Sequence, residues 1–326
     1  MDDTDRRLML LIYENPRMHY REIAKRLGLS RQAVHNRMQV LARIGVFKKM
    51  KATISAHYFD AVLVGVWGRS KTSSVDETLD RLGESDLTSR VVVAGGNFLY
   101  VLGALRDLSE LDGYVEFVKR AAEMPEPTVG IHTLNAGIHP DWADGGKRKE
   151  SYKELSPLDL KIILSLRDDA RKPIAEIADM IGVSAKTVRR HLDDMRSGGV
   201  MDFDEPWDPT SGEDMFTILL LNLKEGADRV KVGRRLLSKR PLNLIMMRSF
   251  SNLPNFLLGI LSSDRMSEIR EILREVAEDE DVLAVTPNLL YLERPYLTWD
   301  EKNPALLARR SEKVKKPRLR SGSNMR

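Results

Sequence analysis

A short stretch near the amino end carries side chains that suit contact with the edges of DNA bases. Apolar residues recur there at helical spacing, so Val34, Met38 and Leu41 would share one face of a helix. The opposite face is polar and free of acids, and its amide, imidazole and guanidinium groups can hydrogen-bond base edges in a major groove. The candidate DNA-contacting residues of this helix are Ser30, Arg31, Gln32, His35, Asn36, Gln39 and Arg43.

Cations surround this predicted helix. The segment from Arg17 to Lys51 contains ten Lys or Arg residues and a single acid, Glu22. Lys48, Lys49 and Lys51 follow the helix directly, where they would meet phosphates beside the groove. Because neutralised phosphates release counterions, such a cluster supplies the sequence-independent part of DNA affinity. The formal net charge of the whole chain, +4, hides this patch because other parts of the chain are acidic.

The helix belongs to a unit that occurs twice. After a shift of 154 positions, REIAKRLGLSRQAV at 21–34 falls on AEIADMIGVSAKTV at 175–188 without a gap. The same register runs from Asp5 over Asp159 to the Gly-Val pairs at 45–46 and 199–200. A unit of this length is a duplicated structural module rather than a chance motif.

Each unit has the pattern of a helix-turn-helix module. Gly28 would end one amphipathic helix in a left-handed conformation and Ser30 would cap the next, and Gly182 and Ser184 repeat the arrangement. The β-prone, alternating stretch at 45–54 of the first unit predicts a wing hairpin after the third helix.

The second unit is electrically different from the first. Its matching helix presents Lys186, Arg189 and Arg190 as candidate DNA-contacting residues. Between 171 and 204, however, six basic residues are balanced by six acids, and the second wing reads MDFDEPWDP. Since carboxylates repel a phosphate backbone, we expect the first module to give most of the DNA affinity. Protein contact is the alternative role for either module, above all the second.

Both units are followed by segments in the order strand, helix, strand, strand, helix, strand, with a hairpin turn at 95–97 in the first half. This order predicts a ferredoxin-like antiparallel sheet with both helices on one face, so the open face requires a partner. The fold class is α+β, a tandem repeat of two winged helix-turn-helix and two ferredoxin-like βαββαβ domains. The predicted domains are 1–56 and 151–209 for the helix-turn-helix modules, 57–145 and 213–298 for the ferredoxin-like domains, and 305–326 for a basic disordered tail.

The chain resembles the Lrp/AsnC family of prokaryotic transcription regulators. The matching positions are Asp5, Glu22-Ile23-Ala24, Gly28-Leu29-Ser30, Val34 and Gly45-Val46, together with the βαββαβ order. The resemblance implies a sequence-specific regulator whose partners are double-stranded DNA and possible small-molecule effectors, bound in that family between subunits. It also implies an intrachain pseudo-dimer and a homodimer of whole chains.

An enzymatic alternative has the same architecture, because siroheme decarboxylases of haem biosynthesis resemble these regulators. That family uses histidines and basic residues around a tetrapyrrole, and His57 lies near the corresponding region. We expect a regulator that is not an enzyme and has no cofactor. No metal is expected either, because His132, His139 and Asp141 lack a fixed ligand spacing.

Composition excludes further classes of protein. The sequence has no cysteine, which removes disulfides, thiol nucleophiles and cysteine-rich zinc sites. No segment approaches the roughly 20 apolar residues that cross a bilayer. The expected location is therefore the cytoplasm, away from membranes.

Overall fold

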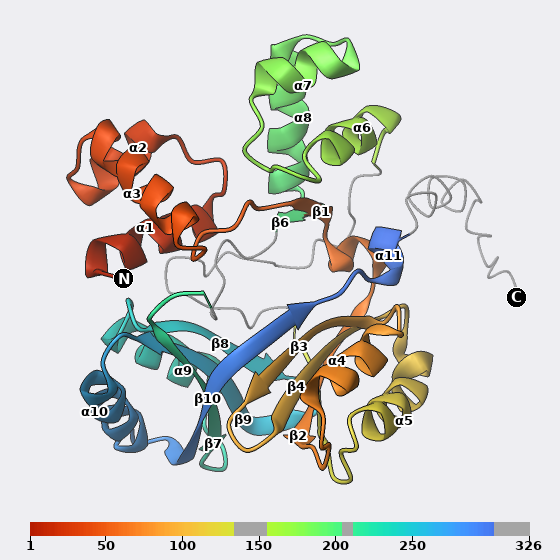
Figure 1. The fold of residues 1–326 in the computed structure, drawn as a ribbon, viewed down its shortest axis with the longest axis vertical. Helices are drawn as coiled ribbons and strands as arrows, with labels where there is room; N and C mark the ends of the chain where they lie inside the picture. The colour runs from red at the N-terminus through yellow and green to blue at the C-terminus, as the bar shows by residue number, and fades with distance from the viewer. Residues whose placement is uncertain (134–154, 204–210, 303–326) are drawn as a thin grey trace, which may run out of the picture.

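The computed structural model describes residues 1–133, 155–203 and 211–302. It contains two layers (Figure 1): two small helical modules in one, and an eight-stranded sheet with four outer helices in the other. The predicted tail at 305–326 lies outside the described residues. Within the described ranges, no helix has the length and apolar character needed to cross a membrane.

Each helical module has the three helices that the repeat predicts. Gly28 and Gly182 end the middle helices with φ of 67° and 77°, and the Ser30 and Ser184 hydroxyls accept hydrogen bonds from the first turns of the third helices. The first module consists of α1 (Asp3–Glu14), α2 (Tyr20–Leu27) and α3 (Arg31–Arg43), and the second of α6 (Pro157–Ser165), α7 (Ile174–Ile181) and α8 (Ala185–Ser197).

One carboxylate in each module joins the first helix to the third. Asp5 completes the capping box of α1 and its Oδ1 lies 2.7 Å from Nη1 of Arg37 on α3. At the equivalent position, Asp159 completes the capping box of α6 and its Oδ1 lies 2.6 Å from Nδ1 of His191 on α8. The same carboxylate thus satisfies helix-end N–H groups and fixes the orientation of the third helix.

The two modules hold each other through a reciprocal pair of arginines. Arg17 donates to the backbone carbonyls of Ala170 and Lys172, and Arg171 donates to those of Pro16 and Met18. These positions are related by the repeat shift, so the contact has pseudo-twofold symmetry. The apolar residues of both modules form one continuous core.

Strand pairing also joins the modules, which corrects one prediction. The prediction of a wing hairpin within the first module at 45–54 is wrong. Instead, β1 (Ala52–Ile54) pairs antiparallel with β6 (Met201–Phe203) of the second module. Two short strands, each too short to make its own hairpin, satisfy their backbone groups across the pseudo-twofold axis.

The second layer contains both predicted βαββαβ units. Their eight strands form one sheet in the order β5-β2-β4-β3-β10-β7-β9-β8. The turn at 95–97 is confirmed, with positive φ at Gly96 and Asn97. The first unit consists of β2 (Val62–Arg69), α4 (Val75–Gly83), β3 (Thr88–Ala94), β4 (Phe98–Leu105), α5 (Leu111–Ala121) and β5 (Thr128–Ile131). The second consists of β7 (Met215–Leu223), α9 (Arg229–Lys239), β8 (Leu244–Phe250), β9 (Leu253–Ser263), α10 (Met266–Ala277) and β10 (Val282–Pro295).

The sheet closes on itself into a barrel. On one side β10 pairs with β3. On the other side the ends of the sheet meet, because the N–H of Ser251 donates to the carbonyl of Ile131 (2.8 Å) and that of Thr133 to the carbonyl of Ser249 (3.2 Å). The open faces of the two units therefore cover each other around an aromatic and aliphatic interior, while separate cores lie under the outer helices.

The layers are attached crosswise (Figure 1). Arg6 of α1 pairs with Asp214 and Asp264 of the second barrel unit, each at 3.3 Å. Arg167, just after α6, donates to the carbonyl of Glu301 (3.1 Å) in α11 (Trp299–Lys302). That helix packs on the first barrel unit, where the indole N–H of Trp299 reaches the carbonyl of Ala104 at 2.9 Å. Each helical module is thus anchored over the barrel unit from the opposite half of the chain.

The reciprocal contact predicts that Arg17→Ala and Arg171→Ala each lower the free energy of unfolding by about 1–3 kcal/mol, because each leaves two partly buried carbonyls without their donor. Urea unfolding followed by circular dichroism measures the change. Arg7→Ala, on the exposed face of α1, is the matched control and should stay close to the parent. Equal stability of all three variants would contradict the reciprocal contact.

The helix-joining carboxylate predicts a pH effect. Burial alone would raise the pKa of Asp159, but hydrogen bonds from Ser156 and His191 lower it below the usual 3.8. Its contribution is therefore complete above pH 3.8 and is lost as pH falls through the lowered value. We expect Asp159→Asn to lower stability by about 1–2 kcal/mol at pH 7 and by progressively less below pH 3.8.

Chemical unfolding of Asp159→Asn between pH 3 and pH 7 provides this measurement. Asp168→Asn, which removes an exposed carboxylate, is the control and should stay close to the parent in stability. A difference between Asp159→Asn and the parent that stays constant over the whole range would rule out the proposed linkage.

Candidate nucleic-acid interface

The outer face of α3 has the composition that the spacing predicts. Val34, Met38 and Leu41 are buried at 0%, 4% and 2% relative exposure, which fixes the rotation of the helix. All the candidate residues predicted on and beside it are exposed, namely Ser30, Arg31, Gln32, His35, Asn36, Gln39 and Arg43. The helix therefore turns an acid-free and mainly polar surface toward solvent, with Val40 exposed beside it.

Two contacts organise this face before any ligand binds. The amide nitrogen of Gln32 donates to the amide oxygen of Asn36 at 2.8 Å, one helical turn away. The ring of His35 lies 5.9 Å from that of Tyr20 on α2. Side chains held in this way lose less conformational freedom on binding.

Two of the cations counted in the sequence are paired with acids of the first module. Arg37 is held by Asp5 (2.7 Å) and Asp2 (2.8 Å), and these hydrogen bonds raise its pKa above the usual value. Arg26 is paired with Glu14 and Glu22. The basic charge exposed on the candidate interface is therefore smaller than the count for residues 17–51, and Arg31 and Arg43 provide it on α3 itself.

The second module places its candidate residues in the same way. Lys186, Arg189 and Arg190 are exposed on α8, and Asp193 is exposed beside them. The equivalent positions in α3 are Gln32, His35, Asn36 and Gln39, in that order. The two faces thus have exposed residues of different charge at equivalent positions.

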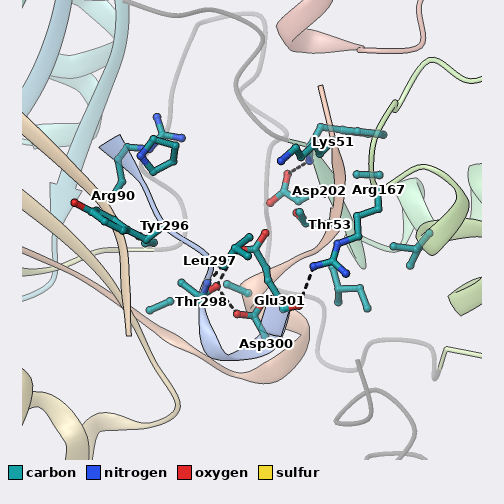
Figure 2. A pocket seen from close by; sticks show the side chains of 18 of the residues that line it. Lys51, Thr53, Arg90, Arg167, Asp202, Tyr296, Leu297, Thr298, Asp300 and Glu301 are labelled. Atoms are coloured by element: carbon teal, nitrogen blue, oxygen red, sulfur yellow. Dashed lines mark hydrogen bonds between the residues drawn. The ribbon is translucent and has the colours of Figure 1, made fainter. Parts of the chain in front are cut away.

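The strand pairing brings an acid to the lysines of the first module. Thr53 is opposite Asp202 in the β1–β6 register. Lys51 and Asp202 lie near each other at one wall of a pocket (Figure 2). Sequence patterns do not predict this approach, because Lys51 and Asp202 belong to different repeats and are not at equivalent positions.

The pocket has a volume of about 690 Å³ and lies between the helical layer and the barrel. Lys48, Lys49 and Lys51 are exposed and line it, so the predicted phosphate contacts lie together but toward the barrel side of the module. Figure 2 shows Arg167 on the same side as Lys51, Arg90 and Tyr296 on the far side, and Asp300 and Glu301 between them. Sequence reasoning missed these residues, which come from distant segments that carry no motif.

The carboxylates of the pocket already have partners. Glu293 pairs with Arg90 at 2.8 Å. Thr298 donates its hydroxyl to Asp300 (2.6 Å) and to Glu301 (3.2 Å), and Arg167 is held by the Glu301 carbonyl.

Comparison with known proteins agrees with the geometry of the helical modules. A family model described as winged helix-turn-helix DNA-binding matches residues 1–48 and 155–200. An HTH-type transcriptional regulator of Pyrococcus abyssi is 30% identical over 119 residues, which cover 35% of this chain and 74% of the relative. The HTH-type transcriptional regulator Ptr1 of Methanocaldococcus jannaschii is 28% identical over 134 residues, or 40% of this chain and 86% of the relative.

A solved structure shares the whole architecture. The siroheme decarboxylase NirDL is similar with a TM-score of 0.57 and 11% identity, over 96% of this chain and 100% of that chain. At this identity the likeness shows the fold alone.

The family model matches both helical modules, and the first of them contains the exposed, acid-free helix face and its caps. The chain belongs to the family of HTH-type transcriptional regulators that bind DNA through a helix-turn-helix domain.

Proposed function

We propose that the chain is a sequence-specific transcription regulator of the Lrp/AsnC type in which the first module provides most of the DNA affinity. The observation that carries this proposal is the outer face of α3, where every candidate residue from Ser30 to Arg43 is exposed and no acid is present. Amide groups such as those of Gln32, Asn36 and Gln39 read base edges, while Arg31 and Arg43 meet phosphates on either side.

The position of the serine cap supports the same reading. Ser30 accepts a hydrogen bond from the N–H of Ala33 at 3.1 Å, so α3 begins sharply and its first turn is rigid. Recognition helices of this kind place their amino-terminal residues against base edges. The first turn of α3 carries Gln32 at this position, beside the phosphate-contacting Arg31.

The second module has a different balance. Its α8 presents Lys186, Arg189 and Arg190, but Asp193 occupies the position of Gln39 and Asp202 approaches the strand of the first module. Carboxylates at these places oppose phosphate contact. In the proposed regulator α8 adds a weaker, less specific contact, and the second module chiefly positions the first through the Arg17 and Arg171 contacts.

The barrel provides the pairing that the family achieves with two subunits. A homodimer of whole chains, a small-molecule effector and a cytoplasmic location complete the proposal and follow from the Lrp/AsnC resemblance. The siroheme decarboxylase alternative is supported by the shared fold. Addition of siroheme to the purified chain tests it, and a Soret band without any DNA binding would replace the regulator with the enzyme.

Base reading by α3 predicts a sharp asymmetry between the two repeats. Genomic fragments that bind the purified chain are first selected and sequenced to define the site. We expect Asn36→Ala to reduce discrimination against the wrong base pair at one position of that site by about 1–3 kcal/mol, because a bidentate amide contact is lost.

Arg190→Ala, at the equivalent position of α8, is the matched control. It should weaken binding to all DNA sequences by about the same factor, because it removes charge rather than base contacts. This factor should be smaller than the effect of Asn36→Ala on the preferred site. Competition binding with single-base variants of the site separates the two effects. Fragments without a shared motif, or equal effects of the two variants, would contradict base reading by α3.

The lysines after α3 predict a salt effect. If Lys48, Lys49 and Lys51 contact phosphates, replacing all three by glutamine should lower the slope of log affinity against log salt by about 2–3. Binding of the selected fragment at several salt concentrations provides the slope. Lys186→Gln on α8 is the control and should change it by less than one. An unchanged slope in the triple variant would mean that these lysines line the pocket and do not contact DNA phosphates.

A further inference from the structure

The interior of the barrel contains a small cavity that the DNA-binding proposal does not use. It has a volume of about 70 Å³ and is lined by residues of both repeats. Trp67 and Phe250 line it with ring centroids 5.0 Å apart, and Phe256 stacks on Trp67 at 5.6 Å. Ile218, Ile260 and Leu290 complete an apolar wall, so most of the lining cannot hydrogen-bond.

One charged group in this lining has no counterion. Arg248 of β8 is partly buried, and its one hydrogen bond among the described residues is from Nε to the sulfur of Met246 at 3.3 Å. No carboxylate within the described ranges forms an ion pair with it. By contrast, the other arginine of the cavity, Arg90, is paired with Glu293 at 2.8 Å. A guanidinium is always charged, and leaving it partly desolvated without a partner is unfavourable.

A neutral histidine lies beside this arginine. Burial and the positive charge of Arg248 together lower the pKa of His132 to about 3, so its imidazole is uncharged at physiological pH. Its ring centroid lies 4.9 Å from that of Phe250. His132 can therefore offer one N–H donor without adding charge. Among the described residues that line the cavity, Arg248 is therefore the charged group without a charged partner.

We propose that the barrel interior binds a small monocarboxylate with a short apolar tail, whose carboxylate pairs with Arg248 and whose tail packs against Ile218, Ile260 and Leu290. The guanidinium fork matches a carboxylate and the rest of the lining matches hydrocarbon. The cavity volume of about 70 Å³ limits the ligand to a few non-hydrogen atoms. This corresponds to anions such as propionate and butyrate.

The same lining disfavours other classes of ligand. An amino acid would bring an ammonium group, and the one carboxylate in the lining, Glu293, is engaged by Arg90. Phosphate and sulfate carry more charge than one guanidinium balances, and apolar walls do not replace their hydration. The inference is independent of DNA binding, because none of the residues involved lies in the helical modules.

Calorimetric titration of the full chain with sodium butyrate tests the proposal. We expect saturable binding of butyrate, weaker binding of acetate, and none of octanoate, which is too long for the cavity. Butyramide, which has the same shape without the charge, and alanine, which adds an ammonium group, should not bind.

Arg248→Met keeps an unbranched side chain and removes the guanidinium group with its charge, and should weaken butyrate binding by about tenfold or more. Arg248→Lys retains a point charge and should bind with intermediate affinity. Lys231→Met, which removes an exposed cation of α9, is the control for net charge and should bind as the parent does. Circular dichroism establishes that each variant is folded.

Three results would overturn the proposal. They are absence of saturable butyrate binding to the folded parent, equal binding of butyramide and butyrate, and equal affinity of the Arg248→Met and Lys231→Met variants. If the chain binds the selected DNA fragments but does not bind butyrate, this inference is wrong and the regulator proposal stands.

Discussion

The structure depends on one constraint: neither repeat can satisfy its own backbone and apolar surfaces. Each βαββαβ sheet has an uncovered face and two open edges, and each helical module has a strand of three residues that cannot form a hairpin alone. Pairing the repeats resolves all of these together. The β10–β3 and β5–β8 contacts close the barrel, β1 meets β6, and Arg17 and Arg171 supply donors to carbonyls of the opposite module.

Local chemistry made much of this predictable. The period of apolar residues correctly identified Val34, Met38 and Leu41 as the buried face of α3. Gly28 and Ser30 marked the turn, because a left-handed residue and a side-chain cap are local requirements. The βαββαβ order was also confirmed, because the apolar periodicity that distinguishes a helix from a strand can be recognised within short stretches of sequence. The DNA-contacting role of the exposed α3 residues stays a prediction.

Contacts between distant segments were not predictable from these signals. Periodicity shows which face of an element is buried and carries no information about its neighbour. The wing hairpin was therefore misplaced, since β-propensity at 52–54 is satisfied equally well by β6 of the other repeat. Because Arg37 is paired with Asp2 and Asp5, it adds less positive charge to the candidate interface than the count from the sequence implies. Arg167, Glu301 and Arg248 lie outside any motif, and only the folded arrangement gives them neighbours.

The covalent union of the repeats has a consequence for how such a molecule changes over generations. In an assembly of identical subunits, every mutation appears in both partners at once, so a substitution that helps one side is also imposed on the other. Here Asn36 and Arg190 occupy matching places and are encoded separately. One copy can therefore change toward base recognition while the other changes toward a supporting role. Because both copies belong to one chain, they are always present in equal number.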